Sequence, residues 1–181
     1  QYRGATMQLD LMERTGKYQN GFCHSPIPTW FNAQGEWVPG QINFTSEAKP
    51  DQVGSGMRAI HTLFHEGGHA AHFANVTQNS PCFSQEYAPT SMTYAETQSM
   101  FCDSLLDDAD WLKRYARNAK GEAIPDELIR ARIESTQPFA AWGERGILVV
   151  PYFERALYRL SDAQLTAEQV LTLARECEQR I

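Results

Sequence analysis

Two histidines and a glutamate lie within five residues of one another, in the order His65-Glu66-Gly67-Gly68-His69. The pattern His-Glu-x-x-His is typical of zinc metalloproteases, in which both histidines bind the metal and the glutamate is the general base. On a helix, residues four apart lie one above the other, so a single turn can present both histidines to one ion. The motif therefore predicts zinc-dependent hydrolysis, with His65 and His69 as ligands and Glu66 as the catalytic carboxylate.

The residues around the motif have helical periodicity. Apolar or small residues recur at steps of three and four and predict one buried face, made of Ile60, Leu63, Phe64, Gly67, Ala71 and Ala74. The histidines His65, His69 and His72 then share a neighbouring face. Each of the two motif glycines costs a helix about 1 kcal/mol relative to alanine, so we expect a neighbouring backbone or a substrate chain close to this turn.

A catalytic zinc site usually has three protein ligands and one open position for water. The acidic candidates downstream of the motif are Glu86, Glu96, Asp103, Asp107 and Asp108. Glu86 falls in a Pro-containing loop, where a carboxylate is harder to hold rigidly. Glu96, Ser99 and Asp103 recur instead on one face of a predicted helix. That face can offer Glu96 as the ligand and Asp103 as an acceptor that orients a ligand histidine.

Structural alternatives stand beside these roles. Thr93-Tyr94-Ala95-Glu96 fits the capping-box pattern, in which the glutamate only satisfies a backbone N–H at a helix start. Asp103 is equally explained as an exposed helix carboxylate. His72 is expected to hydrogen-bond a ligand or to pack, rather than to bind zinc. The run Gln41–Thr45 reads either as an edge strand that pairs with a peptide substrate or as an ordinary core strand.

Composition narrows the class of protein. The 181 residues are 42% hydrophobic and 21% charged, which is typical of globular proteins. A net charge of −6 without a Lys/Arg cluster argues against a nucleic-acid partner, and no apolar run of about 20 residues predicts a membrane span. The four cysteines, Cys23, Cys82, Cys102 and Cys177, are scattered without Cys-x-x-Cys spacing. We therefore expect neither a disulfide framework nor a cysteine zinc site, and we expect a cytoplasmic location.

The chain changes character near residue 50. Residues 1–50 are rich in strand and turn signals, with short strands at 21–24 and 41–45 and a hairpin joining 30–31 to 37–38. Residues 51–181 are helical, with helices predicted at about 56–75, 90–106, 108–118, 125–136, 138–160 and 166–180 and a loop between 77 and 89. We predict a mainly α protein with a small β-sheet, an α+β fold in one domain over residues 1–181, whose zinc-binding helix pair lies under a substrate cleft.

Three ordered segments carry a family likeness. They are Asp10–Lys17 with Gly21-Phe22-Cys23, then His65–His72, then Glu96-Thr97-Gln98-Ser99 with Asp103. Together they resemble the catalytic region of the thimet oligopeptidase and oligoendopeptidase F family of zinc metallopeptidases. The likeness runs from about Asp10 to the end of the chain, and the ordered set is far rarer than His-Glu-x-x-His alone.

The resemblance implies a zincin-like fold and one Zn²⁺ per chain, bound by His65, His69 and Glu96, with Glu66 catalytic and short peptides as substrates. The chain departs from the family pattern at three positions, which bear on substrate preference. Gln98 stands where the family usually has Pro, Gly67 where it usually has a bulky residue, and Asp103 where Glu is common.

Members of the family also carry a stretch with substrate-binding His and Tyr residues, which would be expected after Ile181. We therefore expect the chain, which begins with Gln1, to be a catalytic-core fragment of a longer peptidase, with the remaining parts of its parent chain as partners. The alternative function is a module that binds zinc but is catalytically incomplete.

Overall fold

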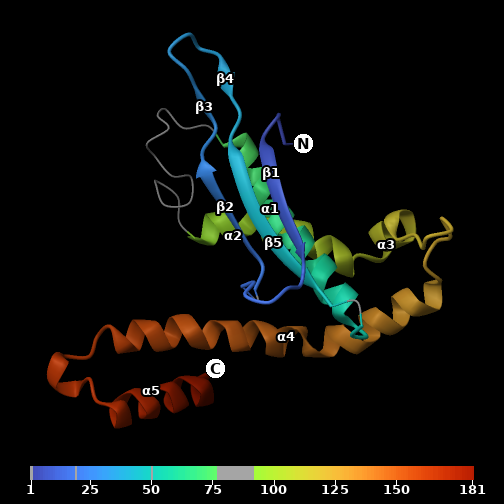
Figure 1. Cartoon of the computed structure of the whole chain (residues 1–181). Coiled ribbons are helices and arrows are strands. Elements are labelled where there is room, and N and C mark those ends of the chain that lie inside the picture. Colours follow the sequence, from blue (N-terminus) through green and yellow to red (C-terminus); the bar gives the residue numbers. More distant parts are fainter. Residues whose placement is uncertain (1, 19, 50, 77–91) are drawn as a thin grey trace. The chain divides into compact units, whose positions relative to one another are not determined.

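The computed structural model describes residues 2–18, 20–49, 51–76 and 92–181. By its internal contacts the chain divides into two compact units, residues 1–116 and 117–181 (Figure 1). The first unit contains the named strands and the motif helix, and the second is helical. The predicted class, mainly α with a small sheet, is confirmed. The expectation of a single domain stays a prediction beside this division.

A three-stranded sheet in the first unit has the order β1 (Thr6–Met12), β5 (Gln41–Ala48), β2 (Phe22–Ile27). β5 pairs in parallel with β1 and antiparallel with β2, so backbone hydrogen bonds occupy both of its edges. The strands predicted near 21–24 and 41–45 are therefore confirmed, whereas β1 was not predicted.

The edge-strand reading of Gln41–Thr45 is wrong, because this run lies in the centre of the sheet. The alternative, a core strand, is confirmed, since Ile42 and Phe44 are 1% and 4% exposed. Each alternate residue of a strand points to the same face, and this pair faces inward. A substrate backbone could add to the described sheet only at β1 or β2.

The predicted hairpin is also confirmed. β3 (Trp30–Phe31) pairs antiparallel with β4 (Trp37–Val38) in a separate two-stranded sheet. The turn between them is organised by Asn32, whose side-chain oxygen accepts hydrogen bonds from the backbone amides of Gln34 and Glu36 at 3.0 and 2.8 Å. An Asn in this position supplies the acceptor that a short turn needs.

The motif helix α1 (Ser55–Asn75) packs against both the sheet and α2 (Met92–Ser104) (Figure 1). A short 3-10 helix η1 (Leu105–Asp107) and α3 (Ala109–Tyr115) follow. These positions agree with the predicted helices to within a few residues. The predicted loop at 77–89 lies outside the described residues.

The buried face of α1 differs from the predicted stripe. Its buried residues are Glu66, Gly68, His69, Ala70, Phe73 and Ala74, whereas Ile60 is 38% exposed. Ala70, Phe73 and Ala74 form the hydrophobic core with Ile42 of β5. The face that carries the chemistry is thus the one turned inward, and Phe64 packs instead edge to face on Trp111 of α3.

The second unit consists of α4 (Asp126–Leu157), a 3-10 helix η2 (Asp162–Gln164) and α5 (Ala167–Arg180). Two separate helices, 125–136 and 138–160, were predicted here, and this is wrong because α4 runs through both ranges with Pro138 and Pro151 inside it. A proline removes one backbone hydrogen bond and strains the preceding turn, which a 32-residue helix packed on α5 can absorb. The predicted start of the last helix is confirmed, since Thr166 accepts a hydrogen bond from the amide of Gln169.

The two glycines of the motif have different surroundings. A Cβ atom on Gly68 would lie 2.7 Å from Cα of Ser99 and 2.9 Å from the carbonyl oxygen of Gln98, both in α2. Among the described residues, a Cβ atom on Gly67 would meet only the hydroxyl of Tyr2, at 3.8 Å. The expected close approach of a neighbouring backbone is therefore real at Gly68, where α1 and α2 touch without an intervening side chain.

This contrast predicts opposite effects of the same substitution. Gly68→Ala should lower the free energy of unfolding by about 1–3 kcal/mol, because backbone atoms of α2 must move. Gly67→Ala should raise it by about 0.5–1 kcal/mol, because alanine is the better helix former and the site is open. Urea unfolding of both variants in the presence of a metal chelator measures the difference, and destabilisation of equal size would contradict the packing argument.

Candidate metal centre

One turn of α1 and one face of α2 bring together three side chains of types that can bind a metal ion. Oε2 of Glu96 lies 3.3 Å from Nε2 of His65 and 3.3 Å from Nε2 of His69. One ligand atom from each residue lies within 4.8 Å of the others. The two histidines come from i and i+4 of α1, and the carboxylate comes from the helix that packs against it.

The spacing fits a zinc ion. Ligand atoms about 2.0–2.1 Å from a tetrahedral zinc lie about 3.3–3.4 Å from one another. Both histidine-to-carboxylate distances have this value. Two imidazoles and one carboxylate are also a donor set that catalytic zinc sites use, with the fourth position left for water.

Asp103 contacts the ring nitrogen of His65 that does not face Glu96. Its Oδ2 lies 2.8 Å from Nδ1 of His65, and its side chain is 14% exposed. A carboxylate at this distance holds the proton on Nδ1, so the lone pair of Nε2 is available to bind a metal ion. Nε2 of His61 lies 3.9 Å from the same oxygen, at the edge of ion-pair distance. The structure thus brings Asp103 into the site, against its reading as an exposed carboxylate.

Glu96 faces the histidines and not the start of its own helix. Thr93 lies inside α2 as described, which begins at Met92. Oε2 of Glu96 is also within 2.9 Å of the hydroxyl of Ser99, a fully buried residue. This arrangement favours the ligand reading over the capping-box alternative.

Of the other acidic candidates in the described part of the chain, Asp107 and Asp108 do not belong to the cluster that His65 and His69 form with Glu96. Asp108 caps α3 by accepting a hydrogen bond from the amide of Trp111, and Asp107 belongs to η1. Glu86 lies outside the described residues. Among the acidic candidates in the described part of the chain, Glu96 and Asp103 are the pair that reaches the motif.

Glu66 is buried next to His65 in the motif helix, with 7% of its surface exposed. Burial raises its pKa from 4.5 to about 7; the nearby charge of His65 opposes this rise and that of Glu96 adds to it. A carboxyl with a raised pKa is a stronger base than an exposed one. The position and environment of Glu66 therefore suit proton transfer.

Gly21, the residue directly before β2, lies against Glu66, a contact that the sequence did not predict. A Cβ atom at this position would lie 3.1 Å from Oε1 of Glu66 and would overlap the methyl group of Thr62. The Asn20-Gly21 pair signals a turn but says nothing about which helix it meets. Only the tertiary structure brings this backbone to the carboxylate of Glu66.

His69 and His72 share a preference for the neutral imidazole. Burial is the main cause that lowers the pKa of each. Neutral imidazole is the form that binds metal. The ring of His72 packs against Phe73 and edge to face against Tyr94, and its nitrogens have no hydrogen-bond partner among the described residues. Of the two expected roles, packing is the one that this geometry favours.

A helix that carries two histidines and a buried glutamate, opposite a carboxylate on a second helix, is an arrangement typical of metal-dependent hydrolases. The chain matches the family described as Peptidase family M3 over residues 4–181, and it belongs to that family. This is a family of zinc-dependent metallopeptidases, whose substrates are peptides. Among the residues described, no helix is long and apolar enough to cross a lipid bilayer.

In zinc-free protein, Glu66→Gln should stabilise the fold above neutral pH. The folded state holds the proton of Glu66 up to about pH 7, whereas the unfolded chain releases it near 4.5, so stability falls as the pH rises between these values. The amide side chain does not titrate and so removes that loss, and we expect a gain of about 1–2 kcal/mol at pH 8 and none at pH 4. Urea unfolding with a chelator measures it, with Glu144→Gln, an exposed site on α4, as the control. Equal stability at pH 8 would contradict the burial argument.

Asp103→Asn should weaken zinc binding by about 10-fold, because an amide lacks the charge that holds Nδ1–H of His65. Competition with a calibrated chelator gives the dissociation constant. Asp110→Asn, at the exposed start of α3, removes the same charge away from the histidine. If both variants bound zinc alike, the role of Asp103 would be lost.

Proposed function

We propose that the chain is a zinc endopeptidase core that hydrolyses short peptides, with zinc bound by His65, His69 and Glu96. The observation that carries the proposal is the pair of 3.3 Å distances from Oε2 of Glu96 to the two Nε2 atoms. The hydrogen bond from His65 to Asp103 supports it, because metal-binding histidines usually donate their other N–H to such an acceptor.

Zinc bound at these residues would act as a Lewis acid, which polarises the scissile carbonyl and lowers the pKa of bound water. Glu66 then accepts a proton from the water that attacks the carbonyl carbon. As the C–N bond breaks, the same carboxyl delivers that proton to the leaving nitrogen. Its burial keeps bulk water from competing for the proton, and Gly21 leaves the carboxylate room next to β2.

We propose β2 as the strand that orders the substrate backbone. In the described sheet β2 pairs on one side only, with β5. It follows directly after Gly21, whose backbone lies against Glu66, so a peptide that runs alongside β2 would pass this carboxylate. Pro26 lacks an N–H and limits such pairing to the part of β2 near the site.

Glu66→Gln should lower the turnover of a quenched fluorescent peptide by about 10²–10⁴-fold, because it removes the base, while the zinc content stays near one per chain. His69→Ala should lose zinc and turnover together. Peptide cleavage assays and metal analysis on the same preparations measure both, with Glu144→Gln as the matched control. A Glu66→Gln variant that cleaves the peptide at the wild-type rate would exclude Glu66 as the base. A zinc content near zero in the folded wild-type protein would overturn the metal site.

A further inference from the structure

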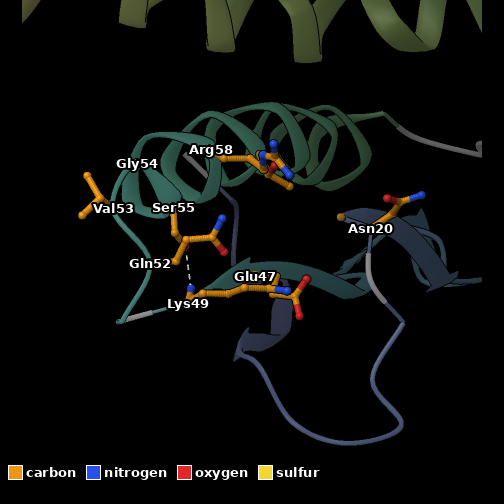
Figure 2. Close-up of a pocket in the computed structure, with 10 residues that line it drawn as sticks. Asn20, Glu47, Lys49, Gln52, Val53, Gly54, Ser55 and Arg58 are labelled. Carbon is orange, nitrogen blue, oxygen red and sulfur yellow. Dashed lines mark hydrogen bonds between the residues drawn. The ribbon is translucent and has the colours of Figure 1, made fainter.

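A polar cavity adjoins the site. It has a volume of about 480 Å³ and lies between the first half of α1 and the end of β5 (Figure 2). The lining residues that matter here are Asn20, Gly21, Glu47, Lys49, Arg58 and Thr62. None of the three proposed zinc ligands lines it, so it is a separate space next to the metal centre.

The cavity reaches Glu66 through two of its lining residues. Thr62 precedes Glu66 by one helical turn, and the backbone of Gly21 lies against Oε1 of that carboxylate. Arg58 precedes Thr62 by a further turn. Since i, i+4 and i+8 follow one face of a helix, these side chains of α1 form a line that leads from the catalytic carboxylate into the cavity.

Arg58 is the charged group on the α1 wall (Figure 2). Among the described residues, its guanidinium has no hydrogen-bond or ion-pair partner. Glu47 and Lys49 stand on the opposite wall, at the end of β5, and the ammonium of Lys49 is already paired with Glu13 at 3.2 Å. Arg58 is therefore the cation of this cavity that is available to a ligand, and a guanidinium binds a carboxylate with two parallel hydrogen bonds.

We propose that this cavity is a substrate subsite in which Arg58 selects a carboxylate on the peptide, either an acidic side chain or the terminal carboxyl group. The inference rests on the proposed peptidase function and adds the chemistry of the substrate to it. Eight residues of helix span about 12 Å. An extended peptide rises about 3.3 Å per residue, so the selected carboxylate lies about two to four residues from the scissile bond.

The test compares peptides that differ in one charge. Glu and Gln are exchanged at each position within four residues of the cleaved bond, and a free C-terminus is exchanged for an amide to separate the two sources of the carboxylate. We expect one acidic position, or the free terminus, to be preferred by about 3- to 10-fold in kcat/KM, as for a partly exposed ion pair. Arg58→Gln should abolish this preference, whereas Arg58→Lys should retain part of it.

Glu47 and Arg3 provide the matched controls. Glu47→Gln removes a negative charge from the opposite wall and should increase the preference for the acidic peptide. Arg3 precedes β1, lies at the end of the sheet far from the cavity, and stacks its guanidinium on Trp37. Arg3→Gln removes this cation and should leave the preference unchanged. The same ratio of rates in wild type and Arg58→Gln would overturn the inference and leave the peptidase proposal intact.

Binding is measured as well as turnover. Fluorescence anisotropy of labelled Glu and Gln peptides with zinc-loaded Glu66→Gln protein, with and without Arg58→Gln, gives the ratio of affinities without catalysis. Zinc-loaded wild type that binds both peptides but cleaves neither counts against the proposed function alone. A ratio of affinities near one, or no binding of either peptide, counts against the subsite.

Discussion

The contact between α1 and α2 at Gly68 is the constraint on which the site depends. Cα of Ser99 would lie 2.7 Å from a side-chain carbon at this position, so the two helices meet backbone to backbone. Glu96 and Asp103 flank Ser99 on α2, and His65 and His69 flank Gly68 on α1. The two halves of the donor set therefore meet only because the helices approach this closely, and a wider spacing would take Glu96 out of range of both imidazoles.

Closeness of this kind requires that polar groups be buried. Glu66 and His69 are 7% and 8% exposed. Burial raises the pKa of Glu66 and lowers that of His69, and both shifts favour the neutral side chain. Such desolvation destabilises a fold but suits the proposed chemistry, because metal binds neutral imidazole and a general base works best with a pKa near the operating pH. The apolar core of Ile42, Ala70 and Phe73 offsets this cost immediately beneath the motif.

Local spacing predicted most of the site, and tertiary contacts supplied the rest. An i, i+4 pair has one geometry on a helix, so His65 and His69 could be placed together from sequence, as could Glu96 with Asp103 on a second helix. The buried face of α1 could not, because glycine and alanine fit either face and the polar residues turned inward. β1 alternates polar and apolar residues over Thr6–Met12, a signal that was present but weak, while Pro138 suggested a break that the long helix α4 absorbs.

One helix then combines the chemistry with recognition of the substrate. A helix keeps its residues at fixed spacing, so Arg58, Thr62 and Glu66 have set positions along one face of α1, next to the proposed subsite. The catalytic half of α1 is immobilised by α2 and the sheet, whereas Arg58 is exposed on the cavity wall. Because Arg58 makes none of the contacts described around Glu66, a substitution in the first half of the helix can alter the proposed substrate preference without moving His65, His69 or Glu96.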